Sequence, residues 1–153
     1  MIIFRIELNR FLWYSLNRLY FIGGILLVKQ TYTGKNVMSS GPYSHAVDSG
    51  DYIFFSGQTA KNAIGKEVGE DITAQTEQCF ENLAAVMTEA EVSFEDVVKV
   101  NVYITGMKHF DEMNAVYQTK FQAPYPARTC VAVLELPLGA DVEIECIVKK
   151  PRR

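Results

Sequence analysis

The residues best suited to chemistry are one arginine and two glutamates, each on an apolar strand. Arg128 opens such a strand, and the apolar run 130–134 follows it. A guanidinium in this setting needs a partner, because an unpaired buried charge is expensive. The later apolar segment 142–148 contains Glu143 and Glu145. Two interpretations stay open: an ordinary Arg–Glu pair that ties two strand ends together, or a fixed anion clamp beside a general base.

Length and charge limit the classes of partner. The chain has 153 residues, 48% hydrophobic and 22% charged, which is typical of one folded domain. The formal net charge is −3, but residues 1–28 carry +2 and the remainder therefore carries −5. Surfaces that bind phosphate backbones need clustered Lys and Arg. We therefore expect no nucleic-acid partner.

The cysteine and histidine pattern argues against a metal site. Cys79, Cys130 and Cys146 are widely spaced within apolar segments, with no CxxC motif, and His45 and His109 form no metal set with them. Zinc and a disulfide framework are both disfavoured by this spacing. We expect reduced cysteines, no metal and a cytoplasmic protein.

Residues 1–28 differ from the rest of the chain. Their apolar run, 19–28, is too short to span a bilayer, and basic residues precede it. A signal-peptide hydrophobic region and a membrane-surface helix are alternatives, but no cleavage pattern follows the run. We interpret the segment as translated upstream sequence with the true start near Val28. We therefore expect a domain at 29–153, an extension at 1–28 outside the fold, and no membrane partner.

Hydrophobic periodicity predicts seven elements in the order ββαβαββ. The helices are expected from Asp71, a good N-cap, through 91, and over 107–121. A loop is expected at 62–66. The strands are predicted at 44–47, 52–55, 97–105, 128–134 and 142–148. This order indicates a single α+β domain, with a mixed sheet and both helices on one face.

The predicted strands are apolar on both faces. Ile53 and Phe55 alternate with Tyr52 and Phe54 on one strand, for example. Two helices cover one face of such a sheet, and soluble monomers avoid a second apolar face of that size. We therefore expect an oligomer in which other copies of the chain cover the second face.

Five motifs, taken together and in order, resemble the reactive intermediate deaminase family, also called the Rid or YjgF family. They are Gly41-Pro42-Tyr43-Ser44, Ser56-Gly57-Gln58, Asn114 with Tyr117, 126–130 and 142–145. The resemblance implies a chorismate-mutase-like fold and a homotrimer with its sites in clefts between subunits. It also implies hydrolysis of enamines and imines, such as 2-aminoacrylate and 2-iminobutanoate, to 2-keto acids and ammonia without a cofactor.

The resemblance also implies roles for single residues. Arg128 matches the arginine that holds the substrate carboxylate, Glu143 the glutamate that activates water, and Tyr43 the tyrosine at the mouth of the site. The positions that match the lining of the site are Ser56, Gly57, Phe110, Asn114 and Cys130.

Several alternatives stay open at this point. Glu145 shares a strand face with Glu143 and is a second candidate partner for Arg128. Cys130 is either a thiol whose pKa is lowered by Arg128 or a small lining residue. Met113 and Tyr117 are expected in the core, and Thr129 is expected to point away from Arg128.

Two other functions compete with deamination. One is a non-catalytic, chaperone-like trimer that binds small carboxylates. The other is a ribonuclease or translation inhibitor, which would need a basic, aromatic groove.

Overall fold

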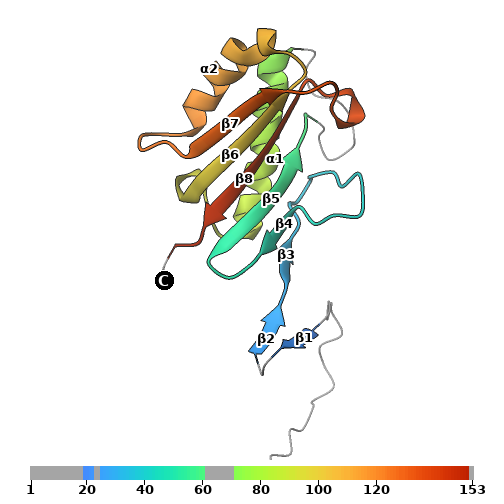
Figure 1. Cartoon of the computed structure of the whole chain (residues 1–153), viewed down its shortest axis with the longest axis vertical. Coiled ribbons are helices and arrows are strands. Elements are labelled where there is room, and N and C mark those ends of the chain that lie inside the picture. The colour runs from blue at the N-terminus through green and yellow to red at the C-terminus, as the bar shows by residue number, and fades with distance from the viewer. Residues whose placement is uncertain (1–18, 23–24, 61–70, 152–153) are drawn as a thin grey trace, which may run out of the picture.

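The computed structural model describes residues 19–22, 25–60 and 71–151, and the predicted loop at 62–66 lies outside them (Figure 1). The helices are α1 (Ile72–Glu89) and α2 (Phe110–Lys120), with 3₁₀ turns η1 (Phe94–Asp96), η2 (Met107–His109) and η3 (Pro137–Gly139). The strands of the main sheet are β3 (Gln30–Tyr32), β4 (Ala46–Asp48), β5 (Tyr52–Gln58), β6 (Val97–Ile104), β7 (Ala127–Ala132) and β8 (Val142–Lys149).

Six strands form one mixed sheet in the order β3-β4-β5-β8-β6-β7. Strands β6 and β7 are parallel and are joined through α2, whereas the other neighbours are antiparallel. The last strand, β8, thus lies between β5 and β6. Strand β6 consequently separates β7, which carries Arg128, from β8, which carries Glu143.

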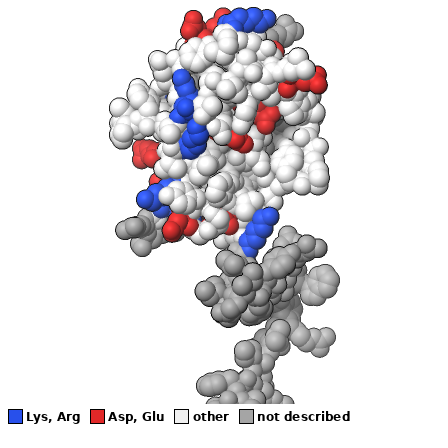
Figure 2. Space-filling model, in the orientation of Figure 1, with Lys and Arg blue, Asp and Glu red and all other residues white. Residues whose placement is uncertain are grey.

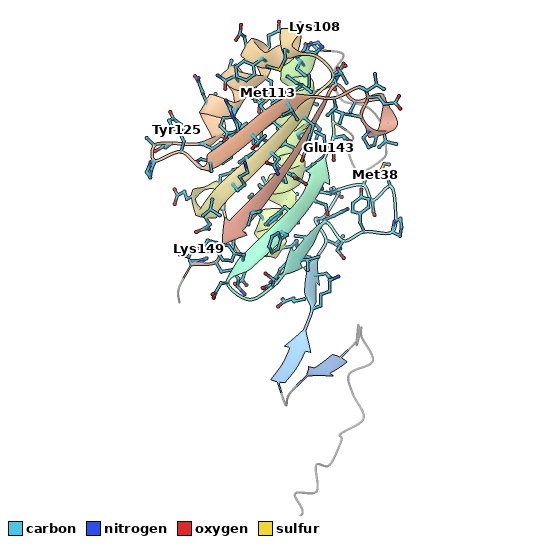
Figure 3. The ribbon with its side chains drawn as sticks, viewed as in Figure 1. Met38, Lys108, Met113, Tyr125, Glu143 and Lys149 are labelled. Carbon is cyan, nitrogen blue, oxygen red and sulfur yellow. The ribbon has the colours of Figure 1, made fainter. Side chains whose placement is uncertain are left out.

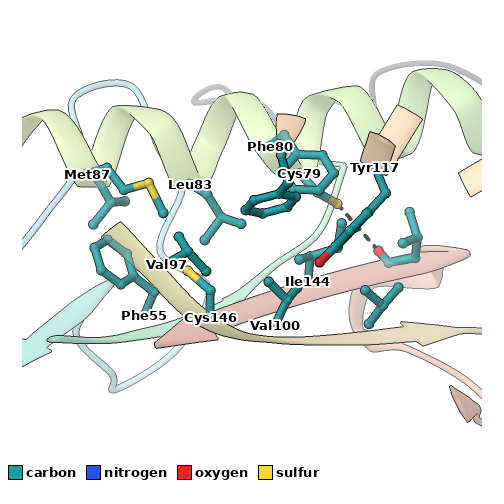
Figure 4. Close-up of a cluster of buried hydrophobic side chains, with 14 of the residues drawn as sticks. Phe55, Cys79, Phe80, Leu83, Met87, Val97, Val100, Tyr117, Ile144 and Cys146 are labelled. Atoms are coloured by element: carbon teal, nitrogen blue, oxygen red, sulfur yellow. Dashed lines mark hydrogen bonds between the residues drawn. The ribbon is translucent and has the colours of Figure 1, made fainter. Parts of the chain in front are cut away.

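Both helices pack on one face of the sheet, as predicted. Helix α1 begins after Asp71, whose carboxylate accepts a hydrogen bond from the Ala74 amide at 2.8 Å. Its buried stripe faces the sheet, and the Cys79 thiol reaches the Val142 carbonyl at 3.7 Å (Figure 4). The fully buried side chains beneath the helices include Ile53, Phe80, Leu83, Val86, Val100, Val102, Ile104, Val142 and Ile144. The single α+β domain with two helices on one face is confirmed.

The other face of the sheet is open and partly apolar. Figure 1 shows α1 behind the sheet, so the viewer looks onto this open face. Tyr52, Phe54 and Val131 are 40%, 47% and 41% exposed there. The second apolar face expected from the sequence is therefore present, and its burial by other copies of the chain stays a prediction.

Two regions differ from the sequence-based expectations. The short edge strand β3 was not predicted, because three residues are too few to show alternation. Strands β1 (Leu19–Ile22) and β2 (Ile25–Val28) form a separate antiparallel two-stranded sheet, so a surface helix over 19–28 is wrong. Residues 1–18 lie outside the described residues, and the domain boundary near 28 stays a prediction. None of the described helices is long and apolar enough to cross a membrane.

Candidate active site

Arg128 is held by one face of helix α2. Its Nη1 atom donates a 2.7 Å hydrogen bond to Oδ1 of Asn114. Its Cζ atom lies 4.4 Å from the ring centroid of Tyr117 and 5.7 Å from that of Phe110. Positions 110, 114 and 117 share one helix face because their spacings are four and three residues. The helix that connects β6 to β7 thus fixes the arginine of β7.

None of the described carboxylates pairs with Arg128. The ion pairs among the described residues join Lys35 to Glu89, Lys120 to Glu77 and Lys150 to Asp48. The interpretation of Arg128 as half of an Arg–Glu pair between strand ends is therefore wrong.

Glu145 has other partners on the open face. It accepts hydrogen bonds from Asn101 Nδ2 at 2.7 Å and from the Tyr103 hydroxyl at 3.0 Å. It shares this face with Glu143, as the spacing predicted, whereas Arg128 points to the helix face. The alternative in which Glu145 neutralises Arg128 is therefore wrong as well.

Cys130 lies beside Arg128 on the same face of β7 and is partly buried. Burial raises the pKa of its thiol, and the nearby Arg128 charge opposes that rise only in part. The alternative of a lowered thiol pKa is wrong, and the role of Cys130 as a small lining residue stays a prediction. Thr129 points to the opposite face, as expected, and accepts a 2.6 Å hydrogen bond from Lys99.

Glu143 belongs to a second group of residues on the open face. Its neighbours Val142 and Ile144 are buried, and strand alternation therefore turns Glu143 away from the core. Figure 3 shows Glu143 at the first end of β8, with Lys149 at the other end. Glu143 lies toward the segment that contains Met38. A hollow of about 250 Å³ is found there. Its lining residues are Ser40, Tyr43, Ser56, Gly57, Thr59, Pro137, Leu138 and Glu143.

Gly57 lets the Glu143 carboxylate lie against β5. A Cβ atom on Gly57 would be 1.8 Å from Oε1 of Glu143, so any side chain here would displace the carboxylate. A register irregularity between Phe55 and Gln58 shapes this part of the strand. Burial raises the pKa of Glu143, and the charge of Glu145 raises it further. A carboxyl with a raised pKa is suited to accept a proton and to return it.

Hydrogen bonds hold Tyr43 at the mouth of this hollow. The Ser56 hydroxyl donates to the Ser44 carbonyl at 2.7 Å and so ties β5 to the segment with Tyr43. The Tyr43 hydroxyl lies 3.1 Å from the Ser40 hydroxyl. Beneath it His45 is buried, and its Nδ1 atom accepts from the Gly34 amide at 3.3 Å. His45 is thus structural, whereas Tyr43 is accessible.

The predicted site residues therefore form two groups on opposite faces of the sheet. The helix-face group contains Phe110, Asn114, Arg128 and Cys130, and the open-face group contains Tyr43, Ser56, Gly57 and Glu143. The clamp and the general base are therefore not adjacent within one chain, and their meeting in a site between subunits stays a prediction. We call each group a candidate half-site.

Sequence reasoning missed one residue of the first half-site. Tyr117 was assigned to the core, and at 4% exposure it does lie there, but its ring face also contacts the Arg128 guanidinium. The spacing of Phe110, Asn114 and Tyr117 was a usable signal. Met113, on the same helix, is fully buried and is confirmed as core.

Neither half-site contains a set of metal ligands. Within the described part of the chain, no group of three His, Cys, Asp or Glu side chains could hold a metal ion. Cys79, Cys130 and Cys146 are unpaired.

A model of the Endoribonuclease L-PSP family, the YjgF/Rid family, matches residues 33–150. The chain belongs to this family. It is 43% identical over 109 residues to the 2-iminobutanoate/2-iminopropanoate deaminase of Dermatophagoides farinae, covering 71% of this chain and 85% of the relative. The sequence-based resemblance to the Rid family is thereby confirmed.

Solved structures agree with this assignment. The crystal structure of RidA from Psychrobacter sp. matches with a TM-score of 0.75 and 41% identity over 79% of this chain and 99% of that one. The crystal structure of E. coli TdcF with bound serine has a TM-score of 0.75 and 35% identity, and the match covers 80% of this chain and all of that one. The fold predicted from the resemblance is the fold of these proteins.

Proposed function

We propose that the protein is a hydrolytic deaminase of 2-imino and 2-enamino acids, such as 2-iminobutanoate and 2-aminoacrylate. One observation carries the proposal: Arg128 is fixed by an amide and two aromatic rings, with no described carboxylate to neutralise it. A fixed guanidinium of this kind suits a ligand carboxylate. Similarity to a relative named as an iminobutanoate deaminase and to a structure with bound serine supports the same substrate class.

We further propose that the site forms between copies of the chain in a homotrimer. One copy holds its two half-sites on opposite sheet faces, so the Arg128 group needs the Glu143 group of a neighbouring copy. The exposed Tyr52, Phe54 and Val131 on the open face favour such packing. The number three rests on the family resemblance.

Arg128 would bind the substrate first. Its planar fork donates two parallel hydrogen bonds to one carboxylate, which a lysine cannot copy. This contact fixes the imine carbon relative to the water molecule and removes rotational freedom.

Glu143 would then act as the general base and general acid. The imine nitrogen first takes a proton from solvent; as the water oxygen then bonds to the imine carbon, the C=N π pair moves to nitrogen and Glu143 accepts a water proton, which gives a neutral carbinolamine. Glu143 returns this proton to the amino group, the C–N bond breaks to release ammonia, and the hydroxyl gives its proton back to solvent as the C=O bond forms. The products are a 2-keto acid and ammonia, and water is the only co-reactant. A positioned acid–base group is worth roughly 10²–10⁴-fold in rate.

Charge disfavours the ribonuclease alternative that the family description names. The chain outside 1–28 has a net charge of −5. Figure 2 shows basic side chains on the open face in small separate groups, with acidic side chains between them. A groove for RNA needs continuous basic and aromatic surface. Salt-dependent RNA binding by the purified protein would contradict this assignment.

The test is release of ammonia and keto acid from 2-iminobutanoate generated in situ by a dehydratase. Wild type should accelerate release, whereas Arg128→Ala should lose the acceleration; Lys108→Ala, which removes an exposed cation, is the control. Glu143→Gln should lose turnover yet still bind the keto acid. Keto-acid binding without acceleration by wild type would favour the non-catalytic carboxylate-binding trimer instead.

A further inference from the structure

The residues that hold Arg128 are all electrically neutral. They are the amide of Asn114 and the rings of Tyr117 and Phe110, all from α2. We infer that Asn114 and Tyr117 are positioning residues whose neutrality leaves the guanidinium charge of Arg128 to the substrate carboxylate. This inference rests on the proposed function. It adds an explanation of why the positive charge of Arg128 is available to the substrate carboxylate.

Asn114 fixes the Arg128 guanidinium by accepting a hydrogen bond from only one of its N–H donors. Its Oδ1 atom accepts one hydrogen bond from Nη1 at 2.7 Å, which is the only hydrogen bond of this guanidinium within the described part of the chain. A guanidinium has five N–H donors. A pair of donors therefore stays free to bind both oxygens of one carboxylate.

Tyr117 supports the plane of the guanidinium from below. Its ring centroid is 4.4 Å from Cζ, a distance that favours cation–π attraction. The ring is itself held by Phe80 at 6.1 Å and Phe121 at 4.7 Å, and Figure 4 shows it beside Phe80 between helix and sheet. Its hydroxyl is buried without a hydrogen-bond partner among the described residues. The ring face, rather than the hydroxyl, is thus the part that Arg128 uses.

The neutrality matters because a carboxylate at the same place would compete with the substrate. Asp has nearly the shape of Asn, and an Asp oxygen would form a stronger, charge-assisted bond to Nη1. It would also cancel the positive potential that attracts a second carboxylate. An Asp at position 114 should therefore hold the Arg128 guanidinium more strongly but weaken binding of the substrate carboxylate. These opposite effects distinguish the proposed role of Asn114 from a merely structural one.

Asn114→Asp tests the inference directly. The readouts are thermal unfolding of the oligomer and calorimetric affinity for 2-ketobutanoate, which carries the carboxylate but needs no turnover. We expect an unchanged or higher unfolding temperature together with an affinity that falls on the order of tenfold or more. A merely structural role predicts higher stability with unchanged affinity, and that result would overturn the inference.

Tyr117 needs a matched pair of variants, because it also lies in the core. Tyr117→Phe keeps the ring face and should keep the affinity for 2-ketobutanoate, whereas Tyr117→Leu should weaken it on the order of tenfold. Phe94→Leu is the control, since Phe94 packs in the same aromatic cluster against Phe80 and Phe121 rather than against Tyr117 or Arg128. Equal affinity loss in Tyr117→Leu and Phe94→Leu would overturn the role of Tyr117.

Binding of 2-ketobutanoate by the wild type distinguishes a failure of this inference from a failure of the proposed function. Failure of the wild type to bind 2-ketobutanoate would overturn the carboxylate clamp and the proposed function with it. Binding by the wild type with an Asn114→Asp variant of equal affinity would overturn the neutrality inference alone.

Discussion

A single glycine sets the position of Glu143, the proposed general base. Because a Cβ on Gly57 would lie 1.8 Å from Oε1 and 2.7 Å from Cδ of Glu143, Gly57→Ala must displace the carboxylate. A misplacement of this size should lower kcat on the order of 100-fold, with little change in thermal stability because Glu143 can swing away. Steady-state kinetics and thermal unfolding would check this. Gly106→Ala is the control, since its Cβ would meet only the Lys108 side chain, at 3.6 Å or more. Wild-type kcat in Gly57→Ala would refute the placement.

A second carboxylate tunes the pH dependence of that base. Burial raises the pKa of Glu143, and the charge of Glu145 raises it further. Catalysis needs the ionised base, so activity should fall on the acid side as Glu143 becomes protonated. Glu145→Gln removes the second cause and should lower the pKa of Glu143, which moves the acid limb of kcat/KM to lower pH. The glutamine oxygen can still accept from Asn101 and Tyr103.

The measurement for this variant is a pH profile of kcat/KM with one substrate, so that the titration of the substrate itself cancels. Glu95→Gln, an exposed change of the same charge on η1, should leave the profile in place. An acid limb that stays put in Glu145→Gln, or moves to higher pH, would contradict the electrostatic link between the two glutamates.

At the scale of elements, periodicity predicted the helices and the longer strands closely. Cys79, Leu83 and Val86 recur at helical spacing and are buried in α1, and alternation in 142–148 matches the buried and open faces of β8. Ends were less accurate: the second helix begins with the η2 turn, and β7 stops at Ala132. The three-residue strand β3 carries too little pattern to be found.

The arrangement of the site residues depends on the order and register of the strands, which sequence reasoning could not predict. Alternation tells which residues of one strand share a face, so Glu143 and Glu145 were correctly placed together. It does not tell which strands are neighbours or how the faces of two strands correspond. The insertion of β6 between β7 and β8 is a tertiary outcome. Its register pairs Val100 with Arg128 and Tyr103 with Glu143, and since Val100 and Tyr103 are three residues apart, Arg128 and Glu143 lie on opposite faces. The motifs therefore named the candidate site residues, but not their arrangement in two groups within one chain.

At the scale of the whole molecule, that division has a direct consequence for mixed oligomers. Arg128→Ala subunits lack one half-site and Glu143→Gln subunits lack the other, and each variant alone should be inactive. In a trimer that contains both, a site is intact where the wild-type Arg128 of one copy meets the wild-type Glu143 of the next. Random mixing in equal amounts should restore about a quarter of the wild-type sites, by closed cyclic symmetry.

Co-expression of the two variants with different affinity tags, followed by purification through both tags, isolates the mixed oligomers. Their deaminase activity is then compared with each variant purified alone, and light scattering gives the number of subunits. Recovery of activity in the mixed species requires that Arg128 and Glu143 act from different copies. Inactive mixed oligomers, with wild type active in the same assay, would mean that both residues act from one chain. That result is incompatible with half-sites on opposite faces of the sheet, so this experiment tests the fold and the mechanism together.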